Sequence, residues 1–259
     1  LFADHPGRIA ALILEPMMHE HPTPGFLRKP RRLCHENGAL FILDEIIAGV
    51  RLHLGGGQAY YGVTPDLSTF GKAMANGFAV SALLGRRDIM SLGGRDHDRE
   101  RVFLLSATHG AESHALAAGL ATLDVCRREN VIDVFYARGE RLRSGVAQVV
   151  AAAGLEKYVQ VFGKASNLVF GTRDAEGRPS PPFRTLFMQE RVRRGILAPS
   201  FVVSFSHTED DIDRTIEAVE AALPAYRRAL QGDVSDVLEG TSVQPVFRRY
   251  GDRRPTAEH

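Results

Sequence analysis

Short apolar runs alternate with helical patterns over the first 134 residues, and this alternation constrains the fold more than any other feature of the chain. The runs are rich in Ile, Leu, Val, Ala and Phe, as strands buried inside a parallel sheet are. The expected strands are Ile9–Leu14, Ala39–Leu43, Leu67–Phe70, Val80–Leu84 and Phe103–Leu105, and the expected helices are Gly25–Asn37 and Glu112–Arg128. Strands that alternate with helices indicate an α/β fold, with a mostly parallel sheet covered on both faces.

The pattern changes after about residue 134 and indicates a second, smaller α+β domain. We expect helices at Val131–Ala153, Phe183–Arg194 and Glu209–Leu223, and strands at Tyr158–Phe162, Asn167–Phe170 and Phe201–Phe205. Thr208 precedes the last of these helices in a capping-box pattern, which satisfies the first free amides of a helix. The predicted domains are therefore residues 1–134 and 135–259.

The charge balance excludes several classes of partner. The chain has 32 basic and 31 acidic residues, a formal net charge of +1, whereas a nucleic-acid or membrane-surface protein carries a basic excess. No apolar run reaches about 18 residues, and Cys34 and Cys126 lack metal-type spacing, so we expect buried thiols and a cytoplasmic location. Because the sequence begins Leu1-Phe2-Ala3 and soon enters a strand, we expect it to be the C-terminal portion of a longer polypeptide.

Two polar residues follow neighbouring predicted strands and suggest a specific chemistry. Asp44 ends the apolar run at 39–43, and Lys72 follows the run at 67–70 after Gly71. A lone lysine can form an imine with pyridoxal 5'-phosphate (PLP), and an aspartate can keep the pyridine nitrogen of PLP protonated. In an open α/β sheet, ligands bind at the carboxyl ends of the strands. Lys72 is also the only charged residue between Leu67 and Val80, which favours a functional role.

The sequence resembles the class III, fold-type I PLP-dependent aminotransferases, and most closely their glutamate-1-semialdehyde 2,1-aminomutase branch. The matching segments are LFILDEIIAGVR (40–51), YYGVTPDLSTFG (60–71) with Lys72, GRRDIM (85–90), THGAESHALAAGLATL (108–123), TEDDIDRTIEA (208–218) and PVFRRY (245–250). The resemblance implies a fold-type I transferase, with part of the PLP-binding large domain followed by the C-terminal small domain.

The resemblance also implies residue roles. Lys72 matches the Schiff-base lysine that also moves the proton, Asp44 matches the partner of the pyridine nitrogen, and Ile46 matches a residue packed against the ring. Thr108 matches a residue that binds the cofactor phosphate of the neighbouring subunit, which implies a homodimer. The implied reaction transfers an amino group between a small-molecule amino donor and an oxo or aldehyde acceptor.

Two features bear on the specific reaction. Ile47 is apolar, as in the aminomutases, whereas many class III aminotransferases have Gln there. The segment SFVVSFS (200–206) is shorter than the aminomutase pattern, and it lacks both the acidic residue of the aminomutases and an Arg that in many relatives holds a substrate carboxylate. An intramolecular aminomutase is therefore the alternative reaction, and a truncated, non-catalytic relative is a further alternative.

Other motifs favour structural interpretations. A P-loop hydrolase would require Gly where the chain has Asp66, and the triplet Gly55-Gly56-Gly57 lacks the strand–helix context of a dinucleotide site, so we interpret it as a flexible loop. The group His19-Glu20-His21 lies between prolines in a loop, and we predict no metal site. Arg51 is expected to form a structural ion pair. His109 and His114 flank the turn that Thr108 begins, and they are minor candidates for contact with the cofactor or substrate.

Overall fold

The computed structural model describes residues 1–17, 20–100, 102 and 108–244. The chain divides into two compact units. The first comprises Leu1–Glu140, Gly163–Leu168 and Val202–Ser206, and the second comprises Arg141–Phe162, Val169–Phe201 and the residues from His207 onward. The expected strand Phe103–Leu105 lies outside the described residues. Within the described residues, no helix is both long and apolar enough to cross a membrane.

The first unit is built on a four-stranded mixed sheet with the strands in chain order: β1 (Ala11–Leu14), β2 (Leu40–Asp44), β3 (Leu67–Phe70) and β4 (Ala82–Gly85). The first three strands are parallel and β4 is antiparallel to β3. All four predicted strands in this region are confirmed to within two residues at each end, and the mostly parallel sheet is as expected.

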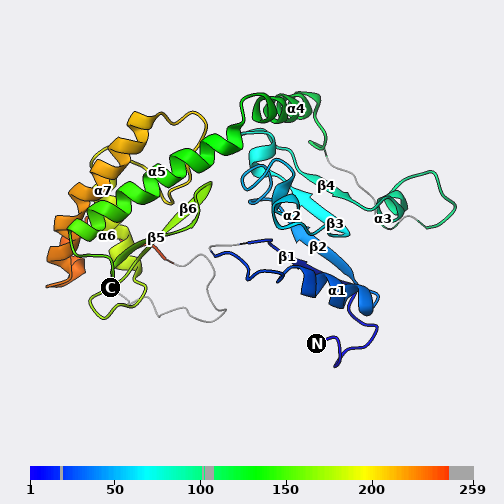
Figure 1. Ribbon diagram of the computed structural model, residues 1–259, viewed down its shortest axis with the longest axis horizontal. Coiled ribbons are helices and arrows are strands. Elements are labelled where there is room, and N and C mark those ends of the chain that lie inside the picture. Colours follow the sequence, from blue (N-terminus) through cyan, green and yellow to red (C-terminus); the bar gives the residue numbers. More distant parts are fainter. Residues whose placement is uncertain (18–19, 101, 103–107, 245–259) are drawn as a thin grey trace, which may run out of the picture. The chain divides into compact units, whose positions relative to one another are not determined.

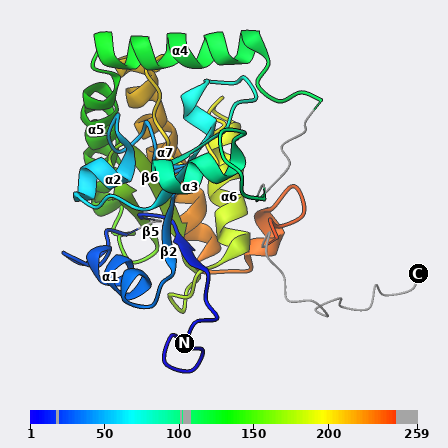
Figure 2. The ribbon, with the colours of Figure 1, turned by 90° about the vertical axis from the view of Figure 1, so that its right-hand side faces the viewer.

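The central strand β2 buries one face against the helix α1 (Arg28–Glu36) (Figures 1 and 2). Phe41 and Leu43 are fully buried and pack with Leu27 and Cys34 in one hydrophobic cluster. Alternating burial along β2 follows from the two-residue period of a strand. The expectation of burial on both faces is wrong for the outer strands β1 and β4, which leave apolar side chains such as Ile13 and Leu84 exposed.

The first unit also contains three helices and two short turns. The helices are α2 (Gly56–Tyr61), α3 (Arg87–Met90) and α4 (Ser113–Arg128), and the 3₁₀ turns are η1 (Lys72–Met74), which follows β3, and η2 (Ser91–Gly93), which follows α3. Helix α4 packs against η1 through its small residues, because Gly119 lies beside Met74 and Ala75. Its leucines Leu116 and Leu120 are exposed instead, although their spacing resembles a buried stripe.

The second unit contains most of α5 (Val131–Ala152), the helices α6 (Pro181–Val192) and α7 (Glu209–Ala229), and the turn η3 (Val234–Val237). Strands β5 (Val159–Lys164) and β6 (Asn167–Thr172) form a two-stranded sheet. Thr208 and Asp211 form the predicted capping box at the start of α7. Helix α7 continues six residues beyond the predicted end at Leu223, through Pro224, because its next turns bury Tyr226 and Ala229.

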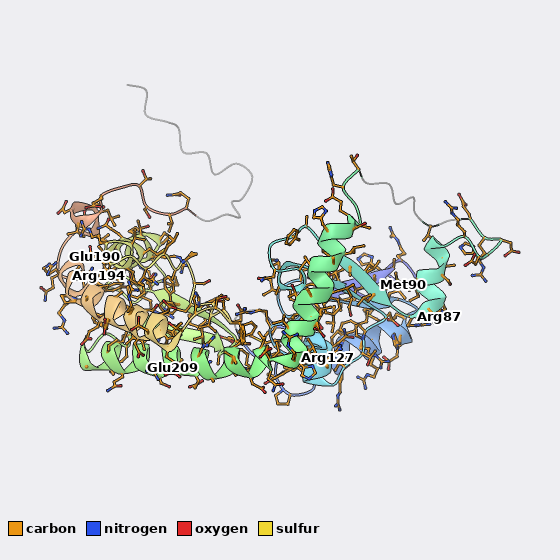
Figure 3. The ribbon with its side chains drawn as sticks, turned by 90° about the horizontal axis from the view of Figure 1, so that it is seen from above. Arg87, Met90, Arg127, Glu190, Arg194 and Glu209 are labelled. Carbon is orange, nitrogen blue, oxygen red and sulfur yellow. The ribbon has the colours of Figure 1, made fainter. Side chains whose placement is uncertain are left out.

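The core of the second unit is aromatic. Phe170 contacts Phe187 and Phe201 at ring-centre distances of 5.2 and 5.0 Å, and Tyr226 contacts Phe183 at 4.9 Å. At the end of α6, the buried Glu190 forms an ion pair of 3.2 Å with Arg194, which lies two residues beyond the helix (Figure 3). The aromatic contacts and the burial of α7 together hold α6 and α7 side by side.

The predicted strand Phe201–Phe205 is wrong. Phe201 makes a single bridge, and residues 202–205 form no strand. The carbonyl groups of this segment are instead bound by arginine side chains: Arg51 donates to Val203 at 2.8 Å, and Arg138 donates to Phe205 at 2.6 Å. Guanidinium donors satisfy these backbone groups, so the segment needs no strand partner.

Candidate active site

Asp44 and Lys72 lie at the same edge of the sheet of the first unit. Strands β2 and β3 are parallel neighbours, and Asp44 is paired in register with Thr69. Lys72 follows β3 by two residues, after Gly71. Because the carboxyl ends of parallel strands meet at one edge, the sheet places both residues where α/β folds bind ligands. The sequence-based expectation of a shared edge therefore agrees with the structure, while the roles of the two side chains stay predictions.

The carboxylate of Asp44 is held through one oxygen. Its Oδ1 atom accepts hydrogen bonds from the backbone amide of Ile46 at 3.0 Å and from the hydroxyl of Thr69 at 3.3 Å. No described residue donates a hydrogen bond to its Oδ2 atom. The side chain is half-buried. One oxygen is therefore fixed by the protein, and the other can accept a hydrogen bond from a bound cation.

Lys72 occupies an unusual backbone conformation. Its φ angle is +43°, in the left-handed region that residues other than glycine rarely adopt. The side chain is exposed and, among the residues that the structure describes, has neither a hydrogen-bond partner nor an ion pair. Lys72 is the first residue of the 3₁₀ turn η1, and residues other than glycine in the left-handed region cluster at functional sites. The geometry thus leaves the amine available for reaction.

Ile46 lies beside the turn that carries Lys72. Its Cγ2 atom is 3.7 Å from the position that a Cβ atom would occupy on Gly71, and its side chain is half-buried. Three of the four predicted site residues therefore lie around the carboxyl ends of β2 and β3.

Thr108 lies apart in sequence, in an exposed turn before α4. The two histidines near it bracket one carboxylate: His109 Nδ1 is 2.9 Å from Glu112 Oε1, and His114 Nε2 is 3.4 Å from Glu112 Oε2. These contacts give both histidines a structural partner. The predicted contact of Thr108 with a phosphate in a neighbouring subunit stays a prediction.

The described part of the chain holds no group of three or more His, Cys, Asp or Glu side chains arranged to bind a metal ion. His19 lies outside the described residues, and His21 Nδ1 is 3.2 Å from the hydroxyl of Tyr61.

Glu45 is a structural residue of this edge that the sequence interpretation missed. It is fully buried, and its carboxylate accepts hydrogen bonds of 2.7 Å from the amides of both Gly57 and Gln58. Burial raises the pKa of Glu45 above its usual range, and the two amides lower it in part. The segment that we expected to be a flexible loop is thus bound around a buried carboxyl group.

The glycines near Glu45 are required by this close approach. A Cβ atom on Gly56 would lie 2.9 Å from the carboxyl group of Glu45, and one on Gly57 would lie 2.6 Å from Pro16. Gly56 also has a φ angle of +79°. The sequence signal was the glycine triplet itself, which begins ten residues after Glu45.

Arg51 does not form the expected ion pair with any residue that the structure describes. Its guanidinium donates to the backbone carbonyls of Ser166 and Val203 and lies 4.3 Å above the ring of Phe135. Burial lowers the pKa of Arg51 to about 10. Backbone carbonyl oxygens and an aromatic ring replace the expected carboxylate, because a planar guanidinium can bind and stack on both.

Asp66 connects four parts of the first unit. Its carboxylate accepts hydrogen bonds from the amide of Phe41 at 2.8 Å and from Arg86 at 2.9 Å, and it lies 2.9 Å from His35 Nε2. Burial alone would raise the pKa of Asp66, but these three partners lower it below its usual value. The network ties α1, β2 and the end of β4 to the residue that precedes β3.

Known proteins resemble this chain over most of its length. The family model for aminotransferase class-III matches residues 1–223. The chain is 32% identical over 231 residues to the 3-aminobutyryl-CoA aminotransferase of Cloacimonas acidaminovorans, covering 86% of this chain and 54% of the relative. It is 35% identical over 241 residues to the glutamate-1-semialdehyde 2,1-aminomutase of Thermomicrobium roseum, covering 88% and 55%.

Solved structures show a similar fold. The FumI protein of Sphingopyxis sp. MTA144, in its PLP internal aldimine form, matches with a TM-score of 0.78 and 28% identity, covering 89% of this chain and 55% of that one. An omega-transaminase from Sphaerobacter thermophilus matches with a TM-score of 0.74 and 26% identity, covering 87% and 54%. The chain thus spans about half the length of the relatives that it matches.

Proposed function

Because this chain belongs to the class III aminotransferase family, we propose that it contributes to PLP-dependent transfer of an amino group from a small-molecule amino donor to an oxo or aldehyde acceptor. The observation that carries the proposal is the placement of Asp44 and Lys72 at the carboxyl ends of adjacent parallel strands. The predicted fold type I is the fold of the family, and the likeness to solved transaminases supports it.

The described residues fit the proposed cofactor. A protonated pyridine nitrogen requires a carboxylate oxygen, and Asp44 Oδ2 has no donor among the described residues. The cofactor aldehyde requires an accessible amine, and Lys72 is exposed without an ion pair in the described part of the chain. Ile46 supplies an apolar side chain beside the Lys72 turn, which suits contact with a flat ring.

In the proposed mechanism, each residue has one task. When bound, PLP would act as an electron sink for the bonds around the amino carbon of the substrate. Lys72 Nζ would hold the cofactor covalently and, once released by the amino donor, would take the proton from the donor's Cα atom. The carboxylate of Asp44 would keep the ring nitrogen protonated through a charge-assisted hydrogen bond.

The proposal extends to the domains and the assembly. We assign residues 1–134 to the PLP-binding domain and 135–259 to the small domain. We also propose a homodimer in which Thr108 reaches the cofactor phosphate of the neighbouring subunit, and its exposed position before α4 is compatible with that contact. A cytoplasmic location is proposed from the two free, buried cysteines.

An intramolecular aminomutase is the second candidate reaction. Ile47 is apolar, as in the aminomutases, and two of the relatives are glutamate-1-semialdehyde 2,1-aminomutases at 35% and 36% identity. The two reactions differ in their need for a second substrate. Isomerisation of a single γ- or δ-amino aldehyde, with no amino acceptor added, would identify the mutase. Product that forms only when an acceptor is added would identify the aminotransferase.

The direct test of the proposed function is cofactor binding by the full chain. Addition of PLP should produce a visible absorbance band that borohydride removes, and Lys72→Ala should abolish the band. Lys157→Ala is the matched control, since Lys157 is another exposed lysine and should leave the band unchanged. A band that persists in Lys72→Ala would overturn the assignment of this lysine.

A further inference from the structure

Thr69 carries an interaction to Asp44 that neither the sequence motifs nor the proposed roles assign. The two residues are paired in register on adjacent parallel strands, and the hydroxyl of Thr69 is 3.3 Å from Asp44 Oδ1. The backbone of Thr69 is fixed as well, because its carbonyl accepts a hydrogen bond of 2.9 Å from the amide of Glu45. A β-branched residue in a strand has few allowed χ1 values, so the hydroxyl has a defined direction.

The carbonyl of Thr69 connects the hydroxyl to the rigid part of this edge. Glu45, which donates to that carbonyl, is itself held by the amides of Gly57 and Gln58 through its buried carboxylate. The end of β3, which carries the Thr69 hydroxyl, is therefore held in place by its hydrogen bond from Glu45. An anchored donor can hold a half-buried carboxylate in one orientation.

The hydrogen bonds to Asp44 are unequally distributed between its two oxygens. Oδ1 accepts from Ile46 and Thr69, whereas Oδ2 accepts from no residue that the structure describes. Two donors on one oxygen set the rotation of the carboxylate about its χ2 angle, which is otherwise broad for aspartate. Only one of these donors, the Thr69 hydroxyl, belongs to a side chain and can be removed by substitution.

We propose that Thr69 is a positioning residue, which holds Oδ1 of Asp44 so that Oδ2 faces the ring nitrogen of the cofactor. The inference rests on the proposed function, because it assigns Asp44 to that nitrogen. Thr69 does not contact the reacting atoms in this scheme and acts only through Asp44. A Thr69 hydroxyl that served the strand alone would affect the melting temperature but not the protonation of the bound ring.

The test compares two substitutions of Thr69 with a control in the same strand. Thr69→Val keeps the shape and removes the donor, and Thr69→Ser keeps the donor. Ser68→Ala alters the adjacent buried residue, whose side chain points to the opposite face of the sheet. The readouts are the ¹⁵N NMR signal of bound PLP labelled at its ring nitrogen, followed over a pH series, and the dissociation constant of PLP.

We expect the ring nitrogen in Thr69→Val to lose its proton at lower pH than in the unmodified chain, with PLP bound about tenfold more weakly, because a hydrogen bond to a charged group contributes about that factor. Thr69→Ser and Ser68→Ala should behave as the unmodified chain. An unchanged nitrogen signal in Thr69→Val would overturn the positioning role alone. A protonated-nitrogen signal missing from the unmodified chain would overturn the assignment of Asp44 and, with it, the proposal.

Discussion

The buried carboxylate of Glu45 should be a main determinant of stability in the first unit. In Glu45→Ala, the amides of Gly57 and Gln58 lose acceptors at 2.7 Å, and the amide of Gly57 is buried. An unsatisfied buried donor costs about 1–3 kcal/mol. The amide of Gln58 is partly exposed, so water offsets part of its loss, and the expected destabilisation is about 3 kcal/mol in total.

Glu45→Gln should be less severe than Glu45→Ala. Its amide oxygen can replace one acceptor, but its NH₂ group would face the second backbone donor, so the expected loss is about 2 kcal/mol. The assay is urea unfolding followed by circular dichroism, with Glu36→Ala as a control that removes only an exposed ion pair of 3.5 Å. A loss below about 1 kcal/mol for Glu45→Ala would refute the reasoning.

The same residue predicts a dependence on pH. The pKa of Glu45 is raised in the folded chain. Its contribution to the free energy of unfolding is therefore fully present below the pKa of an unfolded glutamate, and it is lost as the pH rises through the folded pKa. The unmodified chain should therefore lose part of its advantage over Glu45→Gln between about pH 4 and neutral pH. An advantage over Glu45→Gln that grows with pH would contradict the burial-dominated shift.

Two further predictions concern other buried charges. The pKa of Asp66 is lowered in the folded chain, so its contribution to the free energy of unfolding is present above the unfolded pKa and is lost as the pH falls through the folded pKa. Asp66→Asn should therefore weaken the loss of stability at acid pH. An unchanged loss at acid pH would show that the Asp66 network does not contribute to acid unfolding. Arg191 is fully buried among three phenylalanine rings, and burial lowers its pKa to about 9. Its Nη1 and Nη2 atoms have no hydrogen-bond partner among the residues that the structure describes. Arg191→Met should therefore raise the free energy of unfolding by about 1 kcal/mol in thermal melts, and a loss of that size would show that the guanidinium is net favourable.

The strand ends of the first unit could be predicted because their signals are local. An apolar run ended by Asp44 and another ended by Gly71 and Lys72 indicate parallel strands, whose carboxyl ends share an edge. The fold class follows from the same alternation. The capping box at Thr208 is equally local, since it depends on a spacing of three residues.

The connections at this edge could not be predicted because they depend on register and close approach. Nothing in the sequence states that Thr69 pairs with Asp44 rather than with a neighbour, since register is set by packing across the sheet. The amides of Gly57 and Gln58 reach the carboxylate of Glu45 across 12 and 13 residues of the sequence. Contacts between residues far apart in the sequence can be recognised at most by the glycines that a close approach requires.

Apolar spacing was misleading in two segments. The leucines of α4 have helical spacing, yet the helix packs against η1 through Gly119, which lies beside Met74 and Ala75. The segment after Phe201 is apolar like a strand, but Arg51 and Arg138 bind its carbonyls. The spacing of apolar residues thus identifies a helix or strand, but it does not show which part of the chain packs against that element.

The central claim is that Lys72 alone holds the cofactor, and the four lysines of the chain allow a direct test. The full chain is incubated with PLP, reduced with borohydride, digested and mapped by mass spectrometry. The account predicts a stable adduct on Lys72 and at most trace labelling of Lys29, Lys157 and Lys164. Equal labelling of all four lysines, or a dominant adduct on one of the other three, would contradict it.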